Sequence, residues 1–367
     1  MEKEEDKSSR SPATLPEMDP GIWSRLPEEL LEHVLSFLPL KAFLKLRSTC
    51  KHFNSLISCP SFISKHSPSC TPPFSAFLLL CHRHFRSRYP LFDTTLNSWR
   101  KLSLFPCPLL SCTASLLSVS RSLLCFSLPD SSSFLVCNLL SRTSSIVKFP
   151  IKPFSFELVT LRATSTGFTL FALCSSNTPF VYDSRSQTWS KFEPFNSIIT
   201  DNYYQQGVFF KGCVYFTTSE PISSLGFNLE TGTVIGDLPV PENLAFARLV
   251  SEGEERMYLV GGIGENGIAR KIKVWEFGRE RRWVEVGSVP EMMCRKFMAV
   301  CYHNYEHVYC TWHQGMVCVC VYTWPEVLYY RVGSGTWHWL PKCPALPERW
   351  SCGFRWFSLV PELHAFV

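Results

Sequence analysis

One pattern recurs through most of this chain: a strand-like run ends in a short polar turn, and a large aromatic residue opens the next run. Asp93 opens such a turn before Trp99, and Asp183 does so before Trp189. The other copies run from Asn138 to Ser144, Asn228 to Val234, Phe277 to Trp283 and Arg331 to Trp337, with Ser144 and Val234 in the position of the aromatic residue. The turn positions are 93, 138, 183, 228, 277 and 331, so the intervals are 45, 45, 45, 49 and 54 residues. Such even spacing indicates one repeated structural unit.

A unit of about 45 residues built from short strands predicts a small antiparallel sheet. One such sheet cannot bury both of its faces, but sheets stacked radially around an axis cover one another. Six copies therefore predict a six-bladed β-propeller. The Asp or Asn that opens four of the turns is suited to accept hydrogen bonds from its own backbone. The tryptophan that four of the copies carry is suited to fill the space between neighbouring blades.

The two ends of the chain must close this ring. The runs 353–360 and 363–367 are strand-like and have no turn copy after them. They are therefore expected to complete the blade begun by 74–81. The last interval is nine residues longer than 45, so its strand order stays open and a seventh blade is not excluded.

The composition agrees with a folded, strand-rich chain. Hydrophobic residues make up 46% and charged residues 18% of the sequence, a balance opposite to that of disordered proteins. Aromatic residues reach 14%, and 26 prolines exceed 18 glycines, which favours short strands and turns over long helices. The net charge of +5 is small for a nucleic-acid binder, and no apolar run has the length of a membrane span.

The N-terminal residues follow a different pattern. Residues 1–20 carry six acidic and three basic side chains and are expected to form a disordered tail. Residues 21–66 read as short helices. Prolines then mark a linker over 67–73, before the propeller at 74–367.

The first of these helices carries a broad apolar stripe. Pro27 suits a first helical turn, and two glutamates follow it at the positive end of the helix dipole. Apolar residues then recur at positions 30, 31, 34, 35 and 38, until Pro39 ends the helix. Further helices are expected at about 40–46 and 48–57. So small a helical region cannot bury every apolar residue, so the stripe either packs on the rest of the chain or receives a partner.

Three segments of this region, Ile22 to Leu31, Leu38-Pro39 and Arg47 to Ile57, resemble the F-box family. Phe53 stands where many members have Trp, and Thr49 where Val is usual. The resemblance implies docking to a Skp-type adaptor and, through it, to a cullin–RING ubiquitin ligase. The residues that it implies at this interface, or supporting it, are Trp23, Leu26, Pro27, Leu30, Leu31, Val34, Leu38, Pro39 and Phe53.

The fifth propeller unit resembles a kelch repeat. Its strand from Met257 ends in the pair Gly261-Gly262, and Trp275 and Trp283 follow. Paired glycines permit a close backbone approach or a positive φ. The other units lack the pair, so the kelch pattern is degenerate and WD-type repeats remain an alternative. With the F-box-like region, the chain resembles the plant-type F-box/kelch-repeat proteins.

Motifs that carry catalysis or hold a cofactor find little support. Residues 262–267 match G-x-G-x-x-G, but a strand-like run follows in place of the helix that binds a dinucleotide. Cysteines and histidines at 301, 303, 307, 310 and 313 lack the paired spacing of zinc ligands, and no G-x-S-x-G elbow occurs. We therefore expect no cofactor, no metal site and no intrinsic catalysis.

The expected binding surfaces lie on the propeller. A basic cluster that includes Arg83, Arg86 and Arg88 falls between the first two strands of the first blade. It is either a solvated loop or a patch for an acidic partner. Trp312 and Trp324 are further candidates, because exposed Trp and Arg dominate interface energetics.

Taken with the resemblance, these features predict the substrate-recognition subunit of an SCF-type ubiquitin ligase, which binds a Skp-type adaptor and a target protein. A non-degradative scaffold, such as a transcriptional co-regulator, and a propeller enzyme remain alternatives. The 17 cysteines, an odd number without a secretory signal, favour free thiols and a nuclear or cytoplasmic location. No direct contact with nucleic acid or membrane is expected.

Overall fold

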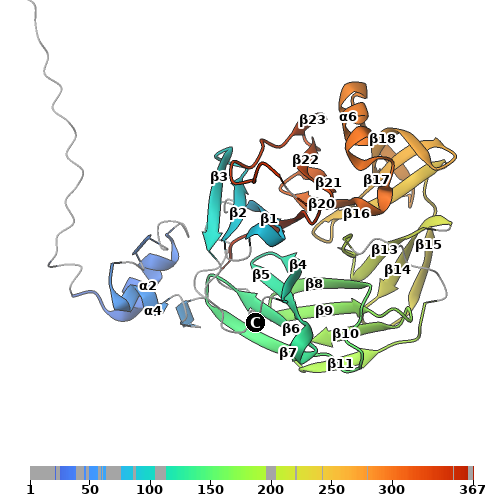
Figure 1. Cartoon of the computed structure of the whole chain (residues 1–367). Helices are drawn as coiled ribbons and strands as arrows, with labels where there is room; N and C mark the ends of the chain where they lie inside the picture. Colours follow the sequence, from blue (N-terminus) through green and yellow to red (C-terminus); the bar gives the residue numbers. More distant parts are fainter. Residues whose placement is uncertain are drawn as a thin grey trace, which may run out of the picture. The chain divides into compact units, whose positions relative to one another are not determined.

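A computed structural model describes residues 21, 25–38, 45–46, 49–56, 59, 61–62, 76–85, 88–103, 113–195, 204–219, 221–241, 243–278, 280–349, 351–362 and 367. The chain divides into two compact units, Met1–Pro72 and Pro73–Val367 (Figure 1). The expected tail at 1–20, the linker at 67–73 and most of the helix expected at 40–46 lie outside the described residues.

The first unit is helical. Its helices include α2 (Glu28–Ser36) and α4 (Lys51–Leu56). Leu35, Leu56 and Phe62 are buried, with 4%, 3% and 0% of their surface exposed. α4 falls within the helix expected at 48–57, whose flanking positions 48 and 57 lie outside the described residues.

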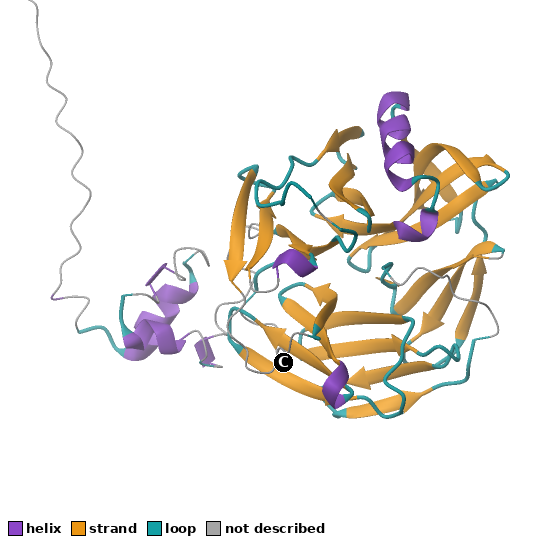
Figure 2. Cartoon of the chain, viewed as in Figure 1, coloured by secondary structure: helices purple, strands orange, loops and turns teal. Residues whose placement is uncertain are grey.

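The second unit is a β-propeller. Its described residues form six four-stranded antiparallel sheets, which are the six predicted blades (Figure 2). From the inner to the outer strand, the first blade consists of β24 (Arg355–Leu359), β1 (Phe77–Cys81), β2 (Arg88–Asp93) and β3 (Ser98–Ser103), and the second of β4 (Ser115–Ser120), β5 (Leu123–Leu128), β6 (Ser133–Asn138) and β7 (Thr143–Lys148). The third consists of β8 (Leu158–Thr164), β9 (Gly167–Leu173), β10 (Pro179–Asp183) and β11 (Thr188–Lys191), and the fourth of β12 (Val208–Phe210), β13 (Cys213–Ser219), β14 (Ile222–Asn228) and β15 (Val234–Leu238). The fifth consists of β16 (Leu244–Glu252), β17 (Arg256–Glu265), β18 (Ile268–Phe277) and β19 (Trp283–Ser288), and the sixth of β20 (Val308–His313), β21 (Met316–Val321), β22 (Trp324–Arg331) and β23 (Thr336–Trp339). Short 3-10 helices η2 (Arg83–Phe85) and η3 (Pro129–Ser131) follow β1 and β5.

The six predicted turns all join the third and fourth strands of their blades. Four of them begin with an Asp or Asn whose side-chain oxygen accepts backbone hydrogen bonds. Asn228 Oδ1, for example, accepts from the N–H groups of Glu230 at 2.9 Å and Thr231 at 3.0 Å. Asp93, Asn138 and Asp183 make the same kind of bond. The turn residues therefore stabilise the hairpins as the sequence predicts.

The repeat tryptophans pack between blades. Trp189 contacts a buried cluster built from the second and third blades, and its Nε1 donates to the carbonyl of Lys148 at 2.9 Å. Trp283 and Trp337 hold the equivalent positions in the clusters between the fourth and fifth and the fifth and sixth blades. These large side chains thus bury apolar surface where adjacent sheets diverge.

The ring is closed by the C-terminal strand. β24 pairs antiparallel with β1 from Phe77↔Leu359 to Cys81↔Arg355. This confirms that the last strand completes the first blade. Positions 363–366 of the second expected strand lie outside the described residues.

One helix in the propeller was not expected from a composition and a repeat that favour short strands and turns. α6 (Glu291–Cys301) follows Pro290 and precedes η4 (Tyr305–His307). It buries Cys294, Phe297, Met298 and Cys301, which are spaced as on one helical face. α6 lies in the last and longest interval, between turn positions 277 and 331. The extra residues of this interval therefore form a helix and not a further blade.

The G-x-G-x-x-G match lies on a hairpin. β17 ends at Glu265 and β18 begins at Ile268, with Asn266 and Gly267 at φ 53° and 73° in the turn. This match therefore opens a strand and not the helix N-terminus that the dinucleotide motif requires. Among the described residues, no helix is long and apolar enough to cross a membrane.

Candidate docking surfaces

α2 begins where the sequence predicts. Pro27 is the residue before the helix, with φ −53° and ψ 144°, and its carbonyl accepts from the N–H groups of Leu30 and Leu31 at 3.0 Å. Glu28 and Glu29 occupy the first turn, where negative charge stabilises the helix dipole.

The apolar residues of α2 and of the two residues that follow it, Phe37 and Leu38, divide into two adjacent stripes. Leu31, Leu35 and Leu38 form the inner stripe, of which Leu35 is 4% exposed. The outer stripe consists of Leu30, Val34 and Phe37, which are 52%, 40% and 52% exposed. Each residue of the outer stripe directly precedes a residue of the inner stripe in sequence, and neighbouring residues lie about 100° apart around a helix. The outer stripe is therefore an apolar surface on a helix whose other side packs inward.

The other implied adaptor-binding residues fall in varied places. Pro27 is exposed, and Leu26 and Phe53 are half-buried. Trp23 and Pro39 lie outside the described residues. Phe37 was missed by the sequence reasoning, although its spacing of three residues from Val34 and seven from Leu30 was a readable signal.

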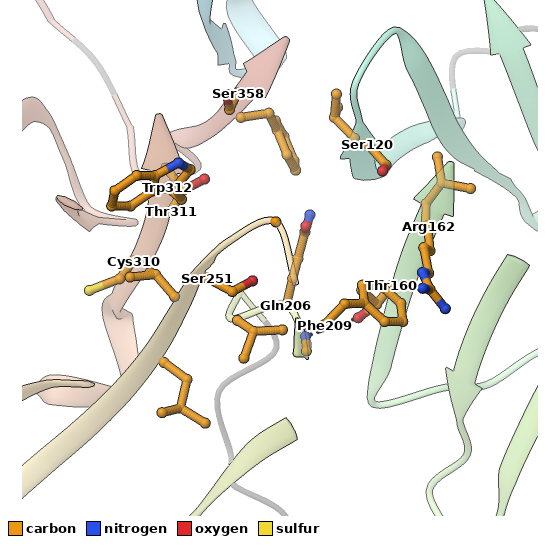
Figure 3. A pocket seen from close by; sticks show the side chains of 18 of the residues that line it. Ser120, Thr160, Arg162, Gln206, Phe209, Ser251, Cys310, Thr311, Trp312 and Ser358 are labelled. Carbon is orange, nitrogen blue, oxygen red and sulfur yellow. Dashed lines mark hydrogen bonds between the residues drawn. The ribbon is translucent and has the colours of Figure 1, made fainter. Parts of the chain in front are cut away.

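The inner strands of the six blades surround a central cavity of about 790 Å³. Figure 3 shows Thr311 and Trp312 on one side of it and Arg162 on the other. Arg162 forms an ion pair with Glu254, which connects the third blade with the turn that follows β16. The labelled hydroxyl groups of Ser120, Thr160 and Ser358 give this lining many hydrogen-bonding groups.

Side chains around this cavity join each blade to a neighbour. Ser118 Oγ accepts from Leu161 N–H and Thr160 Oγ1 from Gly207 N–H, at 3.0 and 2.9 Å. The remaining joints are made by Gln205 to the carbonyl of Leu249, Arg248 to that of Val308, Tyr309 to that of Phe354 and Arg355 to that of Leu116. These bonds satisfy buried polar groups while closing the ring.

Burial shifts the pKa of two ionisable groups near this cavity. Burial raises the pKa of the Cys310 thiol to about 12, so this cysteine is not a thiolate nucleophile at neutral pH. Burial also lowers the pKa of Arg248 to about 10. Its guanidinium donates to the carbonyls of Ala247, Tyr305 and Val308 at 2.6 Å, which is a structural role.

A second hollow, of about 540 Å³, lies on the first blade. We call it the basic groove. Its lining residues are Arg83, His84, Phe85, Arg88, Pro90, Lys101 and Ala345. It brings together Arg83 and Arg88 from the predicted cluster and adds Lys101, which the sequence reasoning missed. Arg86 lies outside the described residues.

The two candidate tryptophans lie elsewhere. Trp312 lines the central cavity and stacks on Tyr258, with ring centroids 5.3 Å apart and planes 5° apart. Trp324 is half-buried against the cluster that joins the fifth and sixth blades. The structure therefore distributes the predicted target-binding residues over three places and does not assemble them into one site.

The chain thus combines a helical unit that exposes an apolar outer stripe with a six-bladed propeller. Comparison with known families matches residues 23–65 to the F-box domain. F-box proteins with a propeller are generally non-catalytic adaptors.

Relatives resemble the chain over nearly its whole length. An F-box/kelch-repeat protein of Arabidopsis thaliana is 50% identical over 365 residues, covering 95% of this chain and 90% of its own. The chain therefore belongs to the F-box/kelch-repeat family of plants. ABERRANT PANICLE ORGANIZATION 1 of Oryza sativa subsp. indica is 27% identical (97% and 92% covered), and UNUSUAL FLORAL ORGANS of Arabidopsis thaliana is 23% identical (89% and 80%).

The propeller fold also has a solved counterpart. A chain in the crystal structure of a nidogen/laminin complex aligns with a TM-score of 0.50 at 9% identity, covering 77% of this chain and 97% of that one. At this identity the likeness concerns the fold alone.

Proposed function

We propose that this protein is the substrate-recognition subunit of an SCF-type cullin–RING ubiquitin ligase. In this proposal α2 and its neighbours dock to a Skp-type adaptor, and the propeller holds the target protein. The chain makes and breaks no bond itself. It raises the effective concentration of the target near the ubiquitin-charged enzyme.

The outer stripe of α2 carries this proposal. Leu30, Val34 and Phe37 leave about half of their surface in water, and burying the rest would contribute about 1 kcal/mol each. The stripe also lies within the residues that match the F-box domain. An apolar surface in this position is what a docking partner would cover.

Co-purification with a Skp-type adaptor tests the proposal. We expect a stoichiometric complex with the wild-type chain and its loss in the triple variant Leu30→Ser, Val34→Ser, Phe37→Ser. The matched control, Glu29→Gln with Lys51→Gln, changes exposed polar residues of α2 and α4 and should bind as the wild type does. Retention of the complex by the triple variant would reject the proposal.

A second variant examines the turn before α2. Leu26→Ala with Pro27→Ala is expected to abolish adaptor binding, while the thermal unfolding of the propeller stays unchanged. Once a target is known, its abundance separates degradation from scaffolding. A target that binds the propeller but does not accumulate with the stripe variant would favour the scaffold.

A further inference from the structure

The basic groove gathers several basic side chains in one hollow without a carboxylate among its lining residues. At other places on the propeller, basic side chains meet carboxylates: Arg256 pairs with Glu276 at 2.8 Å, for example, and Lys296 with Glu326 at 2.5 Å. Within the described part of the chain, none of Arg83, His84, Arg88 and Lys101 forms an ion pair, and no acidic residue lines the groove. The groove therefore concentrates uncompensated positive charge.

The position of these charges follows from the strand register. β2 and β3 pair Arg88 with Ser103 and Pro90 with Lys101, so Arg88 and Lys101 are diagonal neighbours on one face of the sheet. The adjacent Arg100 instead pairs with the buried Asp93 at 3.2 Å. Placing like charges close together lowers the stability of the folded state. Their grouping here is therefore a sign that they bind a negatively charged partner.

The walls of the groove are preformed. Arg83, His84 and Arg88 are exposed, whereas Phe85 and Pro90 are buried beneath them. Phe85 belongs to the cluster that joins the first and sixth blades, and Ala345 packs against the same cluster. The backbone that carries the charges is therefore held by a core, so a ligand would not have to order it.

From these observations we propose that the basic groove binds an acidic, extended segment of the target protein. Diagonal neighbours on a sheet lie roughly 7–8 Å apart. Alternate residues of an extended peptide point the same way and lie roughly 7 Å apart. Carboxylates at alternate positions therefore match the spacing of the groove's cations. The net charge of +5 is too small for a nucleic-acid surface.

This inference rests on the proposed function, because it assigns the partner chemistry to the propeller of a recognition subunit. The probe is a labelled peptide of about eight residues that alternates Glu and Ser, long enough to extend past one diagonal pair. Its fluorescence anisotropy is measured with the full-length chain at low and physiological salt. We expect binding that weakens with salt and no binding of the same peptide with Gln in place of Glu.

The decisive variant is Arg83→Ser, Arg88→Ser, Lys101→Ser. Loss of three exposed ion pairs should weaken binding roughly tenfold or more. The control Lys148→Ser, Lys191→Ser, Lys271→Ser removes the same charge from exposed positions of other blades and should bind almost as the wild type does. Equal affinities in the wild type and the groove variant, or equal losses in both variants, would overturn the proposal.

Two further probes separate the source of negative charge. A neutral peptide with one phosphoserine, or a single-stranded oligonucleotide, that binds where the Glu-Ser peptide does not would also overturn the proposal. Adaptor co-purification is measured on the same samples. If the wild-type chain binds the adaptor but not the peptide, only the peptide-binding role of the basic groove is rejected. If the wild-type chain does not bind the adaptor, the proposed function is rejected.

Discussion

The same kinds of side chain have opposite environments in the two units of this protein. In the propeller, Leu78, Leu80 and Leu124 are completely buried, whereas Leu30 of α2 and Phe37, which follows the helix, are each 52% exposed. The propeller blades bury one another's faces, so each blade needs its leucines for the fold. α2 packs on one side only. The difference teaches that the helical unit leaves leucine and phenylalanine side chains in water, whereas the propeller covers its strand leucines with neighbouring blades.

The largest expected effects come from one chemical change made in both units. Leu80→Ala should lower the free energy of unfolding of the propeller by about 2–5 kcal/mol, because it leaves a cavity in a closed core. Leu30→Ala should change stability by less than about 0.5 kcal/mol yet weaken adaptor binding. Urea unfolding and adaptor pull-down of both variants measure this. Similar stability losses in the two variants would break the comparison.

Adding a methyl group examines how tightly the propeller packs. A Cβ on Gly262 would lie 2.4 Å from Phe246 Cε1 and 2.7 Å from Ala269 Cβ, so Gly262→Ala should cost about 1–3 kcal/mol. Gly236→Ala is the control, because its Cβ would meet nothing within 4 Å. Thermal unfolding of the two variants should differ clearly. If both melt as the wild type does, the double glycine of the fifth blade is not needed for close packing.

A buried histidine joins the ends of the ring and makes its stability depend on pH. His313 contacts Ser358 Oγ at 2.9 Å and Thr94 Oγ1 at 3.2 Å, and burial lowers its pKa from 6.5 to about 4. Above pH 6.5 the imidazole of His313 is neutral in both the folded and the unfolded chain. As the pH falls from 6.5 toward 4, the unfolded chain takes up a proton that the folded chain does not, so stability is lost.

His313→Gln isolates this contribution. At pH 5 it amounts to about 2 kcal/mol, so the stability difference between wild type and variant should shrink by that much from pH 7 to pH 5. Urea unfolding at both pH values measures it, and the variant controls for the other titrating groups. If the stability difference between wild type and variant stays constant with pH, the imidazole of His313 is charged at pH 5 in the folded propeller as well.

The smallest effect is expected at a turn. Asn228→Ala removes the acceptor of two backbone hydrogen bonds and should cost about 1 kcal/mol. Glu230→Gln, an exposed change in the same turn, should be nearly neutral. Chemical denaturation distinguishes them, and equal stabilities would mean that water replaces the Asn228 side chain at no cost.

Several features of this protein were readable from the sequence because they depend on neighbours in the chain. A turn in which Asp183 bonds the N–H of Arg185 needs only residues two positions apart, and its repetition every 45 residues or so set the blade number. The same holds for α2, whose start at Pro27 follows from local rules. The strand expected at 353–360 followed from the repeat, because this strand-like run has no turn copy after it and the blade begun by 74–81 needed a further strand.

Other features required the tertiary structure, because they join residues that are distant in sequence. Which apolar stripe of α2 faces inward is shown only by burial in the folded unit, where Leu35 is 4% and Leu30 is 52% exposed. Lys101 joins Arg83 and Arg88 only through the β2–β3 register, and Ala345 reaches the same groove from the far end of the chain. α6 was missed because its helical period stands inside a strand-rich repeat. Local rules thus determined the repeating units, while long-range packing decided which surfaces those units leave open.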